Sequence, residues 1–320
     1  MSKSLICITT CNRLDEVKKY IWDYIQFCNS NSKFDFLLSL DGQNPEYIEF
    51  CNQFEIPLIY SEANEGVGLS KNRVLKQFPN YDYYFFIEDD VELIDSIVFQ
   101  NHINASELKN YPHLTLTFPR NIISSEQGNE FNFTLAQFGS AHVNFFKGEA
   151  LKKVGGWNDT FAKYKRFGHT EHSYRFVHNN LQPAAFIVLQ DELKHMFIHN
   201  PPHVTNHSIE TNNNQLISEE QELIDKQIKT YPLTTLEAFH FNGNTLNYNK
   251  KVADFLSTNK RRYPLTRGKE RRKSLAEHYF MKMLIKKSLF TKIRYFILSI
   301  VNNPINVPFK HWVKQKLHLA

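Results

Sequence analysis

Apolar runs alternate with amphipathic segments along the first ninety residues. Four short apolar runs that each end at polar turn residues predict β-strands: SLICIT (4–9), FDFLLSL (34–40), PLIYS (57–61) and YYFFI (83–87). Between them, apolar residues at helical spacing predict helices in the stretch 14–27, in EYIEFCNQF (46–54) and in LSKNRVLKQF (69–78). Strands that alternate with helices are typical of a parallel sheet with helices on both faces. The pattern therefore predicts an α/β fold.

The residues that follow these strands are polar, and the fourth strand ends on three acids. The strand ends read TTCNR (9–13), DG (41–42), EANEG (62–66) and EDD (88–90). In parallel sheets these ends share one rim, and ligands bind there. Carboxylates this close raise one another's pKa and cost stability unless a cation, donors or water compensate. The rim therefore predicts a site for something positive, such as Mg²⁺ or Mn²⁺ bridging to phosphates, with a solvated turn as the alternative.

The pattern changes beyond residue 113. Strands are predicted in LTLTFP and AAFIVL (184–189), and a strand pair at 133–147 precedes a short helix in GEALKKVGG. A helix is predicted from Ser218 to Lys229 in an otherwise polar stretch. We found no internal repeat.

Composition indicates a globular protein of the cell interior. Hydrophobic residues make up 42% and charged residues 22% of the chain, as in ordinary soluble proteins. The four cysteines lie within the first 51 residues without CxxC spacing, which favours neither a zinc site nor disulfides and fits a reducing cytosol. The N-terminal apolar run is too short for a signal peptide, and no apolar stretch is long enough to span a membrane. We expect a cytoplasmic protein.

Charge is distributed unevenly. Residues 260–320 carry 16 Lys and Arg against two acids, a balance of +14, whereas the rest of the chain carries 22 against 31. Within this tail, apolar residues recur at helical spacing beside lysines: Met281, Ile285, Leu289, Ile293, Phe296 and Ile300. A basic amphipathic helix suits an anionic membrane surface; a helix packed on the main domain is the alternative. No nucleic-acid-binding motif is present, so we expect no nucleic-acid partner.

Five motifs, in order, resemble GT-A glycosyltransferases of the large family 2 kind. FIEDDVEL is similar to the DxD-type motif of N-acetylglucosaminyltransferases that use a UDP-sugar. The other four are ITTCNR, LSLDGQN, EANEGVGLSKNRVL and GGWNDTFAKYKRFGHTEHSYRF, and the similarity as a whole spans residues 4 to about 205. The resemblance implies a GT-A (Rossmann-like) fold, with a mixed, mainly parallel sheet, flanking helices and a basic C-terminal helical tail. It implies a catalytic domain at 1–235, with a nucleotide-binding half (1–110) and an acceptor-binding half (111–235), before an extension at 236–320.

The resemblance also implies roles for single residues. Asp90 would bind Mn²⁺ or Mg²⁺, and His199 or His203, from a His-rich loop that Pro201 and Pro202 keep from being helical, would be a further ligand. The acceptor side would include Trp157, Asn158 and Asp159. The donor nucleotide would contact Thr9, Arg13, Asp41, Asn64, Gly66, Lys71, Arg73, Glu88 and Asp89.

Glu171 would be the catalytic base of an inverting transfer. It occupies the position in GHTEHSYR where the family's acceptor-side motif has its catalytic Asp, and a carboxylate there would take the proton of the attacking hydroxyl. The alternative is an acid favoured by the dipole of a helix N-terminus.

The expected function is transfer of a sugar from a UDP-sugar to a glycan or glycolipid acceptor, such as a lipooligosaccharide or capsule precursor, at the inner face of the plasma membrane. A sugar-nucleotide pyrophosphorylase is one alternative, but it would need a Gly-rich basic loop that TTCNRLDE lacks. A non-catalytic glycan-binding protein on the same fold is the other.

Overall fold

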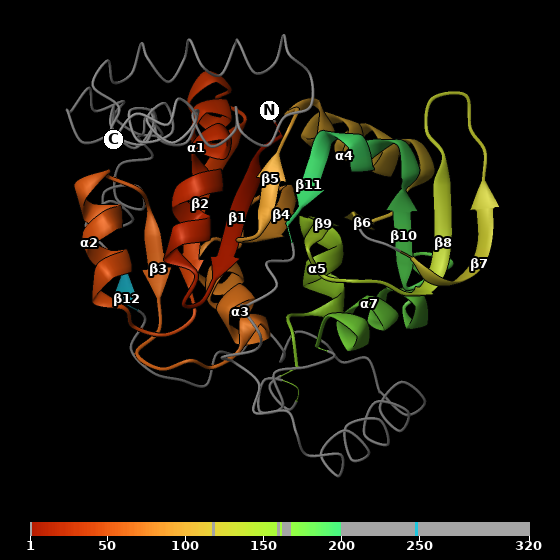
Figure 1. The fold of residues 1–320 in the computed structure, drawn as a ribbon. Helices are drawn as coiled ribbons and strands as arrows, with labels where there is room; N and C mark the ends of the chain where they lie inside the picture. Colours follow the sequence, from red (N-terminus) through yellow and green to blue (C-terminus); the bar gives the residue numbers. More distant parts are fainter. Residues whose placement is uncertain (1, 117–118, 159–160, 162–167, 200–246, 249–320) are drawn as a thin grey trace, which may run out of the picture.

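A ten-stranded mixed sheet forms the centre of the computed structural model, which describes residues 2–116, 119–158, 161, 168–199 and 247–248 (Figure 1). The strand order is β12-β3-β2-β1-β4-β9-β6-β10-β8-β7. Its first part consists of β1 (Ser4–Thr10), β2 (Phe34–Leu40), β3 (Leu58–Tyr60) and β4 (Tyr83–Glu88). These four strands are parallel, as predicted, and their carboxyl ends share one rim.

The second part of the sheet is built around an antiparallel strand. β9 (Val143–Lys147) lies between β4 and β6 and runs antiparallel to both. β10 is parallel to β6, and β8 and β7 complete this side as an antiparallel hairpin. The remaining strands here are β6 (His113–Leu116), β7 (Arg120–Glu126), β8 (Phe133–Phe138) and β10 (Phe186–Leu189). The position of β9 brings residues from the middle of the chain beside the acidic end of β4.

Helices cover both faces of the sheet, because successive apolar residues of the central strands point to opposite faces. Ile6 and Ile8 of β1 pack in the core beneath α1 (Leu14–Ser30), α2 (Pro45–Gln53) and α4 (Ile97–Lys109). Leu5 and Cys7 pack on the other face, against α3 (Val67–Gln77), α5 (Gly148–Val154) and α7 (Gly168–His178). Burial on both faces explains why these strands read as continuous apolar runs.

A separate two-stranded sheet follows the acidic turn. β5 (Val91–Leu93) pairs antiparallel with β11 (Met196–Ile198), which follows the 3₁₀ helix η1 (Gln190–His195). The pairing continues one step further, since the His199 N–H donates to the Asp90 carbonyl at 3.0 Å. The chain's second half thus holds the backbone of the acidic turn.

One short piece of the C-terminal extension lies at the edge of the sheet. β12 (Asn247–Tyr248) pairs antiparallel with β3, so the expected extension contributes a strand to the main domain. The predicted helix at 218–229 and the amphipathic segment at 281–300 lie outside the described residues. Of the helices in the described ranges, none has the length and apolar character needed to cross a membrane.

Candidate active site

The acidic turn after β4 is buried although it carries three carboxylates. Asp89 and Asp90 are 2% and 4% exposed, whereas Glu88 is partly exposed. The Thr10 hydroxyl donates to Asp89 Oδ2 at 2.6 Å. Burial raises the pKa of Asp89 to about 7, against the opposing effects of Arg13 and Thr10. A positive partner lowers the pKa of this buried carboxyl and so favours its ionised form.

Arg13 is that partner within the chain. Its Nη2 lies 2.5 Å from Asp89 Oδ1, and its Nη1 lies 3.1 Å from Asp90 Oδ2. The chain reaches this position through Asn12, whose φ of +54° belongs to the left-handed region that asparagine tolerates. The Arg13 N–H donates to the Tyr47 hydroxyl at 2.8 Å. One guanidinium thus serves two carboxylates.

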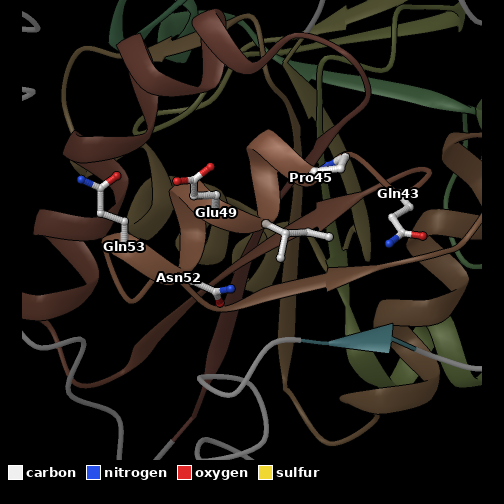
Figure 2. A pocket seen from close by; sticks show the side chains of 6 residues that line it. Gln43, Pro45, Glu49, Asn52 and Gln53 are labelled. Carbon is white, nitrogen blue, oxygen red and sulfur yellow. The ribbon is translucent and has the colours of Figure 1, made fainter.

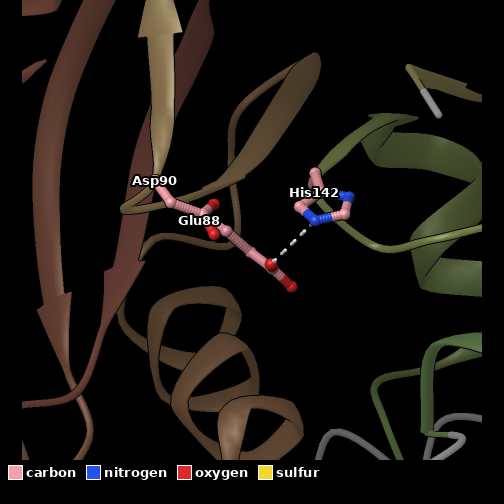
Figure 3. Close-up of side chains that lie close together, drawn as sticks. All are labelled: Glu88, Asp90 and His142. Carbon is pink, nitrogen blue, oxygen red and sulfur yellow. Dashed lines mark ion pairs between the residues drawn. The ribbon is translucent and has the colours of Figure 1, made fainter. Parts of the chain in front are cut away.

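Glu88, Asp90 and His142 form a cluster that fits a divalent cation (Figure 3). Each offers one ligand atom, and these three atoms lie within 4.8 Å of one another. Asp90 Oδ1 is buried and has no hydrogen-bond partner among the described residues. Two carboxylate oxygens and an imidazole nitrogen are donors that Mn²⁺ accepts. The donor set and the unsatisfied oxygen together fit a metal ion.

His142 was not predicted from the sequence. It precedes β9, and its carbonyl accepts from the Glu88 N–H at 2.8 Å. Only the antiparallel pairing of β4 with β9 brings these residues together, and no local pattern in AHVNFF signals that pairing. Glu88, predicted to contact the donor nucleotide, lies in this cluster, and its nucleotide contact stays a prediction.

Asp41 and its neighbours shape the loop before α3. The Asp41 carboxylate accepts from the N–H groups of Glu65 at 2.9 Å and Gly66 at 2.7 Å. Gly66 has a φ of +96°, which a residue with a Cβ rarely adopts. Arg73 Nη1 lies 2.5 Å from Glu65 Oε2, and Arg73 is 1% exposed. Asp41, Gly66 and Arg73, each predicted to contact the nucleotide, here fix one another; their nucleotide contacts stay predictions.

Thr9 and Asn64 also use their side chains within the protein. Thr9 Oγ1 donates to the Ile87 carbonyl at 3.3 Å, and Asn64 Nδ2 lies 3.0 Å from Cys11 Sγ. Asn64 is partly exposed and lies near the rim. Their predicted contacts with the donor stay predictions.

Lys71 and Trp157 lie in the core rather than at the rim. Lys71 is 1% exposed, and its Nζ lies 5.1 Å from the ring centroid of Trp157 and 5.8 Å from that of Phe86. Burial lowers the pKa of Lys71 to about 8. Trp157 is 2% exposed, and its backbone exchanges two 2.7 Å hydrogen bonds with the Asn72 side chain. The indole of Trp157 lies in the core beneath β4, and its predicted contact with the acceptor stays a prediction.

Glu171 lies in a closed ion pair. It is 2% exposed, and its oxygens accept from Arg175 Nε at 2.5 Å and Nη2 at 2.8 Å. Arg175 Nη1 also donates to the carbonyls of Val154 and Gly156, which ties α7 to the end of α5. Burial raises the pKa of Glu171, while Arg175 opposes the rise. Both carboxylate oxygens are thus engaged by Arg175, and the role of Glu171 as the base stays a prediction.

His199 lies near the acidic turn but outside the three-residue cluster. Its ring stacks on Tyr20 with 4.4 Å between centroids, and its Nε2 lies 2.9 Å from Glu92 Oε2. In this structure the imidazole pairs with Glu92, and the predicted role of His199 as a metal ligand stays a prediction. Asn158 is partly exposed, whereas His203 and Asp159 lie outside the described residues.

An open hollow of about 500 Å³ lies elsewhere, on α2 (Figure 2). Its walls contain none of the predicted site residues, being formed by Gln43, Pro45, Ile48, Glu49, Asn52 and Gln53. The candidate site at the acidic turn is identified by its charged groups.

Comparison with known proteins shows the fold. No family model and no curated protein sequence matches the chain. The S. aureus TarS 1–349 structure in complex with UDP matches with a TM-score of 0.51 and 12% identity, over 92% of this chain and 89% of that one. A second crystal structure of S. aureus TarS 1–349 matches with a TM-score of 0.49 and 12% identity, over 94% of this chain and 88% of that one. The structure of GalNAc-T7 with UDP, GalNAc and Mn²⁺ matches with a TM-score of 0.43 and 7% identity, over 58% of this chain and 41% of that one. The likeness to UDP-bound TarS, together with the strand order, confirms the predicted GT-A architecture.

Proposed function

We propose that the chain is a glycosyltransferase that moves a sugar from a UDP-sugar to a hydroxyl of a glycan acceptor with the help of a divalent cation. One observation carries the proposal: Asp90, buried at the carboxyl end of β4 beside Glu88 and His142, has one oxygen that accepts no hydrogen bond from any of the described residues. A fold shared with a protein crystallised with UDP supports the choice of donor. The motif resemblance supports the reaction class.

Each residue of the acidic turn has a distinct task in this proposal. Asp90 and Glu88 hold the cation, which when bound offsets charge that grows on the departing diphosphate. Arg13 lowers the pKa of Asp89 and holds both Asp89 and Asp90 in place, and its side chain, 22% exposed, faces the rim where phosphate oxygens would lie. Thr10 orients Asp89 for hydrogen bonding to the donor's sugar or ribose.

Glu171 is the proposed base on its motif alone, and its ion pair defines the competing role. A base must come within about 3 Å of the proton that it takes, so Glu171 would have to leave Arg175 on acceptor binding. If it does, Glu171→Gln lowers kcat by about 10²- to 10⁴-fold while the protein melts close to the wild-type temperature. If Glu171 only fastens α7, the same variant loses stability and keeps kcat in its folded fraction.

We extend the proposal to the acceptor from the sequence of the tail. A basic amphipathic segment would bring the enzyme to an anionic membrane surface, where lipid-linked glycan precursors such as those of lipooligosaccharide or capsule are built. Inversion at the anomeric carbon follows from the motif resemblance. Product analysis by NMR of the new glycosidic bond tests this part.

The direct test is UDP release from a panel of UDP-sugars, with Mn²⁺ and after chelation. We expect release only with the cation, and a loss of at least about 100-fold in Asp90→Asn. Asp15→Asn, an exposed site on α1, is the matched control and should keep wild-type turnover. Formation of UTP from pyrophosphate would favour a pyrophosphorylase. Binding of glycan without turnover of any donor would favour a non-catalytic protein.

A further inference from the structure

Sheet pairing fixes His142 opposite Glu88. Ile87 of β4 pairs with Val143 of β9, and the Glu88 N–H donates to the His142 carbonyl at the end of this ladder. The two side chains point toward each other, with His142 Nε2 lying 3.9 Å from Glu88 Oε2 (Figure 3). Both are held by main-chain hydrogen bonds of the central sheet, so their approach does not depend on a loop.

The imidazole of His142 is oriented by a second contact. Its Nδ1 lies 2.6 Å from Ser140 Oγ. When Nδ1–H donates to the hydroxyl, Nε2 carries the lone pair and faces Glu88. This is how histidines that bind metals are held in proteins, with one nitrogen on the ion and the other on a fixed acceptor.

Asp90 supplies the third atom of the cluster. Its Oδ2 is taken by Arg13 at 3.1 Å, whereas its buried Oδ1 has no partner among the described residues. A cation can therefore bind Oδ1 without displacing the guanidinium. Two ligand atoms at about 2.2 Å from one ion lie between about 3 and 4.4 Å apart, so the present spacing within 4.8 Å needs only small side-chain movements.

We propose that His142 is a protein ligand of the divalent cation beside Glu88 and Asp90, with Ser140 as the positioning residue that directs its Nε2, and that this nitrogen makes the site prefer Mn²⁺ over Mg²⁺. The inference rests on the proposed function, in which the cation acts on the diphosphate of a UDP-sugar. Mg²⁺ favours all-oxygen sites, whereas imidazole raises the affinity for later first-row metals. The ligand thus comes from the strand beside β4 and not from the His-rich loop.

The geometry around His199 agrees with this assignment. The His199 Nε2 is bonded to Glu92, its ring is stacked on Tyr20, and its N–H holds the Asp90 carbonyl. We assign it to the support of the acidic turn. His199→Gln, which keeps a donor for Glu92, is therefore the matched control for His142→Gln.

The test measures Mn²⁺ on the full chain without donor or acceptor. Electron-spin-echo spectroscopy detects the nitrogen nucleus of an imidazole bound to Mn²⁺, and a competition titration gives the Mn²⁺ and Mg²⁺ affinities. We expect the nitrogen signal in wild type and in His199→Gln, and its loss in His142→Gln with a fall in Mn²⁺ affinity of about 10- to 100-fold. Ser140→Ala should lower the affinity less and keep the signal.

A second variant separates ligation from folding. His142→Asp replaces nitrogen by oxygen, so it should still bind a cation but with a lower ratio of Mn²⁺ to Mg²⁺ affinity. A nitrogen signal that survives in His142→Gln, or disappears in His199→Gln, overturns the proposal. Because these measurements need no sugar donor, a chain that shows the signal but turns over no UDP-sugar would refute the proposed function and not the ligand assignment.

Discussion

The acidic turn and helix α7 each bury a carboxylate beside an arginine, but with different charge balances. In the turn, Arg13 is shared between Asp89 and Asp90, and one oxygen of Asp90 has no hydrogen-bond partner within the part of the chain that the structure describes. In α7, both oxygens of Glu171 accept from Arg175, whose side chain is 3% exposed and also holds two backbone carbonyls. In the acidic turn two carboxylates share one arginine, which leaves an excess of negative charge, whereas the charges of Glu171 and Arg175 balance.

This difference teaches which buried acid belongs to a binding site. A matched, fully hydrogen-bonded pair satisfies its own charges and attracts no further ion. An excess of carboxylates around one arginine gains by binding a cation, and the partial exposure of Glu88 and His142 gives that cation a way in. The comparison therefore favours the turn as the place where a further cation would bind, and the role of Glu171 as the base stays a prediction.

The largest expected effect comes from breaking the α7 pair. Arg175→Met leaves Glu171 buried without its counter-charge and should lower the free energy of unfolding by about 3–5 kcal/mol. Urea denaturation measures this. The double variant Glu171→Met with Arg175→Met should recover most of the loss, because replacing a whole buried pair by apolar groups is often neutral. Equal losses in the single and double variants would show that the pair is not what fastens α7.

The second largest effect that we expect is a loss of folding stability near α7 as the pH falls. His113 lies between β6 and α7, with Nε2 at 2.9 Å from Ser173 Oγ and Nδ1 at 3.0 Å from the Phe145 carbonyl. Burial lowers the pKa of His113 to about 3. Its neutral form thus supports folding fully above the unfolded pKa of about 6.5, and this support is lost as pH falls toward 3.

His113→Gln should therefore reduce the slope of unfolding free energy against pH in this window, although it lowers stability at pH 7. Chemical denaturation at several pH values between 4 and 7 checks this. His178→Gln, on the same helix but partly exposed, is the control and should keep the wild-type slope. An unchanged slope in His113→Gln would contradict the assigned cause.

Lys71→Met should have the smallest effect on folding. The amine lies against the rings of Trp157 and Phe86, and burial lowers its pKa. An apolar side chain of similar length should therefore change the free energy of unfolding by no more than about 1–2 kcal/mol. The same variant tests the predicted nucleotide contact. If Lys71 contacts the diphosphate, KM for the donor rises; if the lysine only fills the core, KM is unchanged. Thermal melting and donor titration provide both readouts.

Much of the parallel half could be predicted from the sequence, because strands buried on both faces are unbroken apolar runs. The run YYFFI followed by EDD locates both β4 and the acids at its end, and the rim rule then places Arg13 beside them. The closed pair in α7 also had a signal, since Glu171 and Arg175 are four residues apart on a helix.

The rest depended on contacts that no local pattern encodes. His142 reaches Glu88 only because β9 lies between β4 and β6, and AHVNFF reads the same whichever strand it joins. Trp157 resembles an acceptor contact in its motif, yet its burial follows from the two hydrogen bonds to Asn72 on a distant helix. Short motifs predicted positions along the chain better than they predicted which way side chains face.

The most direct test of the acidic turn as a cation site is calorimetric titration of UDP, with and without Mn²⁺, into wild type and Asp90→Asn. The account predicts that Mn²⁺ strengthens UDP binding by at least about tenfold in wild type, since the ion neutralises the turn and bridges to the diphosphate, and that this gain disappears in Asp90→Asn. Equal UDP affinity with and without Mn²⁺ in wild type, or an undiminished gain in the variant, would contradict it.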